Sequence, residues 1–276
     1  MSGCREPRYI QKEDGKGKQS IDTKVPQKVL RYFPLGPRLA RLYTVHWIAE
    51  AITWHARAEI GDNLMRHPID SSMWKAANLQ YPEFSQESRN VRLGISTDGF
   101  NPFGNLSTNH SIWPVFVTPY NLPPSLCMKK EFSILTLLIP GHKAPSDDID
   151  IFLAPLVEEL NDLWVEGMKA FDSFKQETFT LRVMLLWAIH DFPAYGTLSG
   201  CNVHGYLGCL ICGEKTEATY LSESHKAFYH SHRRFLPLCH KFRTVESNFL
   251  PEGVEQRLAP RKLLVEEVEA KSALVF

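Results

Sequence analysis

The sequence predicts an α/β fold, a mixed β-sheet with flanking helices, followed by a small Cys/His-rich segment. Three observations carry this prediction. Apolar residues indicate strands at 91–97, 112–118 and 132–139. Helical spacing of apolar residues follows at 147–171, and another apolar run covers 179–189. The order β-β-β-α-β predicts three antiparallel strands, a helix, and a fourth strand that rejoins the sheet beside the first.

The N-terminal part precedes this sheet. Residues 1–24 are polar and rich in Gly and Lys, and they predict a flexible basic tail. Residues 25–90 predict a helical region: one amphipathic helix after Pro37, then a turn-rich connector with short helical pieces, including 71–79. The expected buried face of the first helix is Leu39, Leu42, Tyr43, Trp47, Ile48, Ala51, Ile52 and His55. His46 and His55 are expected to be packing or surface groups rather than metal ligands.

The helix predicted at 147–171 is amphipathic. Asp147, Asp148 and Asp150 lie in its first turn, where acids complement the helix dipole. Its expected buried face is Leu153, Leu156, Val157, Leu160, Leu163 and Trp164. Its expected solvated glutamates are Glu158, Glu159 and Glu166.

Two apolar runs end on an acid. Asp98 follows Thr97 in TDGFNPFG, and Asp191 follows His190 in HDFPAYG. If the two strands are neighbours, their carboxylates should lie within about 4–8 Å and share a divalent cation such as Mg²⁺, as in sites that cut phosphodiesters. The alternative is that both acids only cap turns, since Asp-Gly and Asp-x-Pro are ordinary turn signals.

Cysteines and histidines gather after the second acid. Cys209 and Cys212 form a Cys-x₂-Cys knuckle, a spacing that lets two thiolates hold one tetrahedral Zn²⁺. The preferred partners are His232 and His240; the alternative set replaces these histidines with Cys201 and His204. Two buried thiols, or a redox pair, are the other interpretations, although no thioredoxin-like βαβ pattern surrounds the knuckle. A structural zinc would stabilise this loop-rich stretch.

Composition limits the class of protein. The 276 residues carry 31 basic and 31 acidic side chains and are 43% hydrophobic. The first 41 residues contain ten Lys/Arg against four Asp/Glu, and residues 225–243 are basic and His-rich, so charge is segregated, which allows a protein of zero net charge to bind nucleic acid. No apolar run reaches the roughly 18 residues of a membrane span, and the N-terminus lacks a secretory signal. An intracellular protein with unpaired cysteines is therefore expected.

Longer phrases resemble a known family. They are KVLRYFPLGPRLARLY, RNVRLGISTDGFNPFGNLS, WPVFVTPYNLPPSLCMK, LLIPGHKAPSDDIDIFLAPLVEEL, DFPAYGTLSG and HRRFLP. They are similar to transposases of plant CACTA (En/Spm-type) DNA transposons. The resemblance covers residues 24–243 and runs weakly through 261–268.

The resemblance implies an RNase H-like core, at 91–200, that cleaves and joins DNA with a DDE triad of Mg²⁺- or Mn²⁺-binding acids. Asp98 and Asp191, 93 residues apart, match its first two positions. It also implies a zinc-binding insertion at 201–243, matched by Cys209, Cys212 and His232. Cys201 has no counterpart there, which favours the set with His232 and His240. Transposon-end DNA as partner, self-association and a nuclear location are the further implications.

The chain departs from that family pattern. The third acid is not evident, because Glu266, Glu267 and Glu269 lie in the charged segment 244–276. The family's N-terminal Cys-x₂-Cys-Gly is reduced to Cys4. We therefore expect a truncated transposase core, inactive alone; the alternative is a noncatalytic DNA- or protein-binding remnant.

Two groups of side chains near these sites also bear on DNA binding. Arg233 and Arg234, beside the zinc candidate, are candidate phosphate contacts. Phe100, Phe103 and Phe192, near the acids, are expected to be core residues rather than base-stacking groups.

Overall fold

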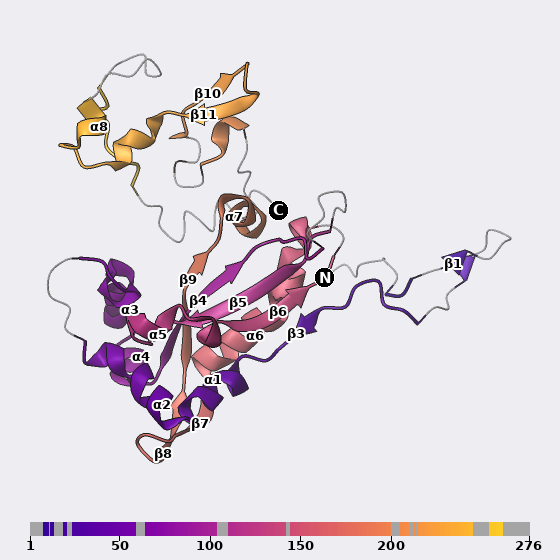
Figure 1. The fold of residues 1–276 in the computed structure, drawn as a ribbon, viewed down its shortest axis with the longest axis vertical. Helices are drawn as coiled ribbons and strands as arrows, with labels where there is room; N and C mark the ends of the chain where they lie inside the picture. Colours follow the sequence, from indigo (N-terminus) through magenta and orange to yellow (C-terminus); the bar gives the residue numbers. More distant parts are fainter. Residues whose placement is uncertain are drawn as a thin grey trace. The chain divides into compact units, whose positions relative to one another are not determined.

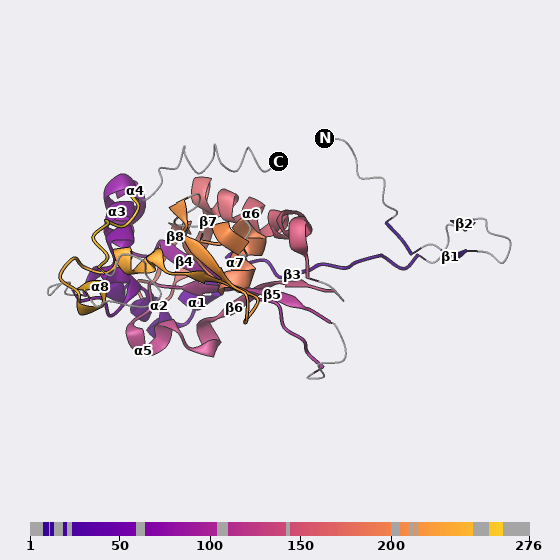
Figure 2. The same cartoon turned by 90° about the horizontal axis from the view of Figure 1, so that it is seen from above.

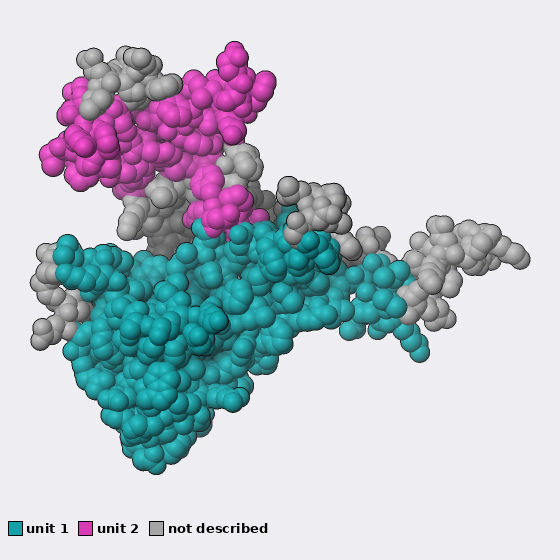
Figure 3. Space-filling view, viewed as in Figure 1, with its two compact units in different colours: residues 1–190 teal, residues 191–276 magenta. Residues whose placement is uncertain are grey.

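The protein is described by a computed structural model that divides into two compact units, residues 1–190 and residues 191–276 (Figure 3). The described residues are 8–10, 12–13, 19–20, 24–58, 64–103, 110–141, 144–199, 205–209, 212, 215–244 and 254–261. The helices of residues 25–90 belong to the same unit as the sheet. Among the described helices, none combines the length and apolar character needed to cross a membrane.

A five-stranded mixed sheet forms the centre of unit 1, in the order β3-β6-β5-β4-β9 (Figure 1). Its strands are β3 (Arg31–Tyr32), β4 (Val91–Thr97), β5 (Trp113–Pro119), β6 (Ile134–Ile139) and β9 (Val183–Ile189). Strands β4, β5 and β6 are antiparallel neighbours, whereas β9 runs parallel to β4. The predicted pairing of the first and fourth strands is confirmed. A mixed α/β fold is therefore established.

The N-terminal helical region contains two helices where one was predicted. Helix α1 (Gly36–Tyr43) ends before Thr44, and α2 (His46–Ile52) begins after Val45, whose extended backbone breaks the helix. The prediction of one continuous helix is therefore wrong, and Trp47, expected in the core, is 54% exposed, whereas Ile52 is buried as predicted. A short hairpin of β1 (Lys12–Glu13) and β2 (Gln19–Ser20) precedes this region.

Short helices follow as predicted. They are the 3₁₀ helices η1 (Trp54–Ala56) and η2 (Pro68–Asp70), then α3 (Ser72–Gln80) and α4 (Pro82–Gln86). Ser71 caps α3, because its hydroxyl accepts the Trp74 N–H at 3.0 Å. His55 is a packing residue as predicted: Asn121 Nδ2 lies 2.8 Å from its Nε2, and burial lowers its pKa to about 4.

The crossover helix α6 (Ile149–Val165) is shorter than predicted. It packs on β6 and β9 along one face of the sheet (Figure 2). Gly167, at φ +73°, ends it, because its N–H and that of Glu166 both bond to the Asp162 carbonyl. The chain then forms a hairpin of β7 (Met168–Asp172) and β8 (Glu177–Leu181), where the sequence predicted helix up to Phe171. Between β5 and β6 lie α5 (Pro124–Cys127) and η3 (Lys130–Phe132), and η4 (Ser146–Asp148) precedes α6.

Two predictions about the faces of α6 are wrong. Val157, expected in the core, is 58% exposed. Glu159, expected in solvent, is partly buried: it accepts the backbone N–H groups of Leu35 at 2.8 Å and Gly36 at 2.9 Å, and the hydroxyl of Tyr32. Glu159 therefore satisfies the N-terminus of α1, and a long-range cap of this kind leaves no pattern in the sequence.

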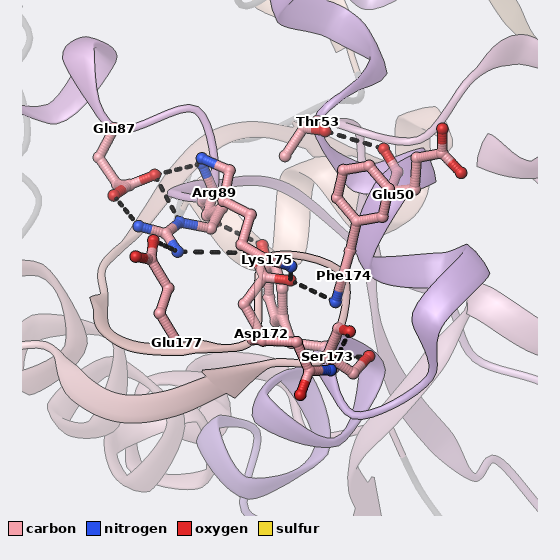
Figure 4. A network of polar contacts seen from close by, with 11 residues as sticks. Glu50, Thr53, Glu87, Arg89, Asp172, Ser173, Phe174, Lys175 and Glu177 are labelled. Atoms are coloured by element: carbon pink, nitrogen blue, oxygen red, sulfur yellow. Dashed lines mark hydrogen bonds and ion pairs between the residues drawn. The ribbon is translucent and has the colours of Figure 1, made fainter.

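A polar network around Arg89 fixes the β7–β8 hairpin to residues 87–89, which lie just before β4 (Figure 4). The guanidinium bonds Glu87 at 2.6 Å, Glu177 at 2.7 Å and the buried Asp172 at 3.4 Å. It also stacks 4.1 Å from the centre of the Phe179 ring. The Asp172 carboxylate in turn accepts the backbone N–H groups of the turn that follows β7.

Few apolar side chains are buried among the described residues of unit 2, and the buried Arg243 links several of its segments. Its described elements are α7 (Phe192–Ser199), η5 (Gly205–Leu207), β10 (Ala218–Leu221), β11 (Lys226–Tyr229), η7 (Ser231–Phe235) and α8 (Lys241–Thr244). Arg243 is 1% exposed, and its guanidinium donates to five backbone carbonyls. Backbone groups from 233–236 and 255–257 are thereby tied to α8.

Candidate functional site

The ends of β4 and β9 carry the two candidate metal-binding acids. The strands pair in parallel from Val91 opposite Val183 to Ser96 opposite Ile189. A β-bulge interrupts the ladder: Leu93 faces Leu185, but Gly94 faces Trp187, so Leu186 has no partner in β4. One extra residue reverses which side chains face which side of the sheet. Beyond the bulge, residues 93 apart in the sequence are paired.

A hydrogen bond holds these strand ends together. The Nδ1 atom of His190 lies 3.1 Å from the Thr97 backbone nitrogen and 3.1 Å from the Thr97 carbonyl oxygen. Its tautomer decides whether it accepts the N–H or donates to the carbonyl. The Thr97 hydroxyl donates to the Pro114 carbonyl at 2.8 Å, which fixes β4 to β5 as well. The residue after Thr97 is Asp98, and the residue after His190 is Asp191.

Asp98 stands at the start of a constrained, solvent-exposed turn. Its Oδ1 accepts the Gly99 N–H at 2.7 Å, and it forms no ion pair with any residue in the described ranges. A Cβ at Gly99 would lie 2.5 Å from Nε1 of Trp113, so only glycine fits against this ring. The carboxylate is thus accessible to a cation from solvent.

Asp191 begins unit 2 and caps α7. Its Oδ1 accepts the Ala194 N–H at 2.8 Å, and its carbonyl accepts the Tyr195 N–H at 2.9 Å. The side chain is exposed. One carboxylate oxygen of Asp191 is therefore used for capping, and the second oxygen can bind a metal ion. The turn-capping interpretation holds for both acids, and it leaves metal binding open to both.

The Cys/His cluster in unit 2 brings together three of the four preferred zinc ligands. The ligand atoms of Cys209, Cys212 and His232 all lie within 4.8 Å of one another. His240 does not join them; its Nδ1 instead accepts the Phe242 N–H at 3.2 Å. The choice of His240 is therefore wrong for this geometry. Cys201 and His204, the alternative partners, lie outside the described residues.

The chemistry of this cluster suits zinc. Both sulfurs are largely buried. Burial raises the pKa of Cys212, while the Arg234 side chain, which donates to it, opposes that rise. Burial lowers the pKa of His232, which favours the neutral imidazole that a metal requires. Two thiols and a neutral imidazole converging on one point fit three corners of a tetrahedral Zn²⁺ site.

The arginine pair beside the cluster divides into two roles. Arg234 is 7% exposed, and it donates to the Lys215 carbonyl at 2.9 Å, so it is not available as a phosphate contact. Arg233 is partly exposed and donates to the Phe242 carbonyl at 2.8 Å. The sequence prediction therefore survives for Arg233 alone. Nothing in the sequence separates the two, because burial of Arg234 depends on the folded loop around Cys212.

The aromatic residues near the acids are exposed, contrary to the expectation that they fill the core. Phe100 is 49% exposed, Phe103 65% and Phe192 47%. The late glutamates considered as a third acid, Glu266, Glu267 and Glu269, lie outside the described residues. Sequence reasoning missed two features of the site: the bulge at Leu186, which has no composition signal, and His190, which was visible next to Asp191 but has no motif of its own.

Comparison with known proteins identifies the family. No curated protein matches the chain. The model of the transposase family tnp2 matches residues 62–274, well over half of the chain. This span includes Asp98, Asp191 and the Cys/His cluster. The chain therefore belongs to the transposase family tnp2.

Proposed function

We propose that this chain is the metal-binding catalytic region of a DDE-type DNA transposase with an RNase H-like core, in which Asp98 and Asp191 hold a divalent cation. The observation that carries the proposal is the register of β4 and β9 after the bulge. Extending that register by two residues beyond Ser96 and Ile189 would bring Asp98 and Asp191 level with each other, which supports a shared metal site. With the register that precedes the bulge, in which Leu93 faces Leu185, His190 rather than Asp191 would come level with Asp98.

The proposed chemistry is cleavage and joining of DNA strands. Mg²⁺ or Mn²⁺ at such carboxylates would activate a water or 3′-hydroxyl and stabilise the leaving oxygen. The Asp98 carboxylate is held by its turn, and the Asp191 carboxylate by its capping bond to Ala194. His190 positions the two strand ends relative to each other through Thr97. Arg233 is a candidate contact to DNA phosphate.

Two finer assignments complete the proposal. Resemblance to plant CACTA (En/Spm-type) elements supports transposon ends as the DNA substrate, a nuclear location and self-association. The cluster of Cys209, Cys212 and His232 supports a structural zinc, with a fourth ligand from Cys201 or His204.

Activity of this chain alone is expected to be low. A DDE site needs a third acid, and Asp98 and Asp191 are the acids that this arrangement supplies. A metal displaced by about 1 Å from its productive position can lose about 10²-fold in rate. We therefore propose weak Mg²⁺ or Mn²⁺ binding, little cleavage, and nonspecific DNA binding that weakens steeply with salt.

Mn²⁺ titration followed by electron paramagnetic resonance tests the metal site. The full chain should bind Mn²⁺, and Asp98→Asn and Asp191→Asn should each weaken binding about tenfold or more, as loss of a ligand charge predicts. Asp162→Asn, which changes an exposed acid on α6, is the matched control and should bind as the wild type. Wild-type Mn²⁺ affinity in both Asp98→Asn and Asp191→Asn would reject the proposal.

Nicking of supercoiled plasmid separates low activity from a complete enzyme. Little or no Mg²⁺-dependent nicking is expected. Efficient nicking that Asp98→Ala abolishes would show that the third acid is present and would point to Glu266, Glu267 or Glu269. Salt-sensitive DNA binding without metal binding would instead favour the noncatalytic alternative.

A further inference from the structure

We propose that the turn carrying Phe100 and Phe103 is a stacking platform for an unpaired nucleobase in the DNA strand that Asp98 would act on. This inference rests on the proposed function of Asp98 and names the part of the substrate that the site holds. The starting observation is exposure: 65% of Phe103 and 49% of Phe100 face solvent. Two large apolar side chains exposed on one short turn form an apolar patch of the kind that marks binding sites.

Backbone and side-chain hydrogen bonds fix the described parts of this turn, residues 98–103 and 110–112. Phe100 exchanges both backbone hydrogen bonds with Ile112, at 3.0 and 2.9 Å. The Phe103 N–H donates to Asn101 Oδ1 at 3.0 Å, which closes an Asx turn. Gly99 fits closely against Trp113 at the base of the turn. The rings are therefore presented by a fixed backbone, which lowers the entropy cost of binding.

The Phe103 ring is itself oriented. It meets His110 edge to face, with ring centroids 5.1 Å apart and planes at 87°. In this geometry the imidazole contacts at most one face of the phenyl ring, and among the described residues no second aromatic ring contacts Phe103. Trp47 and Tyr206 are also exposed, but neither is near a candidate acid in sequence.

The position of this turn next to Asp98 indicates which ligand it would bind. Phe100 is two residues from Asp98, so their Cα atoms are at most about 7 Å apart. A DNA strand whose phosphate approached Asp98 would bring a neighbouring base to the rings of Phe100 and Phe103. Among the described residues of this turn, 98–103 and 110–112, there is no Lys or Arg to bind a phosphate, so the exposed rings suit a base rather than a phosphate. Bases are exposed for stacking only where the duplex is frayed or single-stranded.

Fluorescence anisotropy with labelled oligothymidylate, in buffer without added Mg²⁺ or Mn²⁺, tests the platform. The full-length Phe103→Ala variant should bind roughly 5- to 150-fold more weakly than wild type, the cost of losing one base stack. Phe103→Trp should keep wild-type affinity because tryptophan also offers a π-face, whereas Phe103→Leu should lose as much as alanine. Phe171→Ala, which removes an exposed phenylalanine of β7, is the matched control and should bind as wild type. Blunt duplex should bind all variants equally.

Two results would overturn the inference: unchanged single-strand affinity in Phe103→Ala, or equal affinity in Phe103→Leu and Phe103→Trp. Equal affinity in these two variants would mean that the DNA contact is a general apolar one rather than base stacking. Circular dichroism confirms that each variant is folded. Because the DNA assay contains no added Mg²⁺ or Mn²⁺, failure of the Asp98 site would appear only in the Mn²⁺ titration, and failure of the platform only in the DNA assay.

Discussion

Removal of Arg89 should destabilise unit 1 more than any loss of a surface ion pair. Its three carboxylate partners differ in burial: Glu177 is 54% exposed, Glu87 31% and Asp172 1%, measured on side chains. An exposed pair contributes about 0–1 kcal/mol to the free energy of unfolding, so Glu177→Ala should cost no more than that. Arg89→Ala leaves the Asp172 carboxylate buried without a cation, which costs about 3–5 kcal/mol.

Urea unfolding of the full chain, followed by tryptophan fluorescence, measures this difference. Arg89→Met keeps most of the stacking on Phe179 but not the charge, and it should still lose most of the stability. Arg89→Met/Asp172→Asn removes both charges of the buried pair and should recover part of that loss. A cost below about 1 kcal/mol for Arg89→Ala, or no recovery in the double variant, would refute the assignment of Asp172 as the dominant partner.

The same network predicts a pH dependence. The hydrogen bonds from Arg89 lower the pKa of Glu87 below its ordinary value. A carboxyl with a lowered pKa in the folded state stabilises the protein above its unfolded pKa of about 4.3, and this contribution is lost as pH falls through the lower folded pKa. Stability should therefore fall with acidification below about pH 4.3, and Arg89→Met should fall less steeply over the same range.

Further predictions follow from single sites. Gly94→Ala should lower the free energy of unfolding by about 1–3 kcal/mol, because the new Cβ would lie 2.4 Å from the Tyr120 ring. Adding Tyr120→Leu to the same chain should restore part of this stability, and urea midpoints measure both effects. Arg92 is buried between two aromatic rings, and its Nε and Nη1 atoms have no hydrogen-bond partner. The free energy of unfolding of Arg92→Met should therefore stay within about 1.5 kcal/mol of wild type, whereas Arg92→Ala should lose about 2–5 kcal/mol. Purified protein should contain stoichiometric zinc by atomic absorption. Cys212→Ser should reduce the zinc content and His240→Ala should not. Unchanged zinc content in Cys212→Ser would reject the site.

The sheet was predictable from local patterns, and the details that complete it were not. Alternation between Val91 and Thr97 fixes a strand because one face of it must be buried. The end of α6 was missed because the apolar spacing continues past Gly167, where only the positive φ of glycine marks the stop. Likewise the single apolar run at 179–189 hides the break at Arg182, whose backbone N–H bonds to the Asn90 side chain.

The candidate sites divide in the same way. Asp98, Asp191 and the Cys-x₂-Cys pair could be named from sequence because they are short motifs whose chemistry is local. The bulge at Leu186, the cap made by Glu159 and the burial of Arg234 could not, because each depends on segments that meet only in the folded chain. His240 was chosen on spacing, and spacing does not determine the direction in which a ring points.

Anomalous diffraction from crystals of the full chain grown with Mn²⁺ tests the shared metal site most directly. We predict one Mn²⁺ bound by a carboxylate oxygen from each of Asp98 and Asp191, at about 2.1 Å, with the two carboxylates about 4–8 Å apart. A Mn²⁺ ion held by only one of these acids, or the two carboxylates at opposite ends of the sheet, would contradict the account.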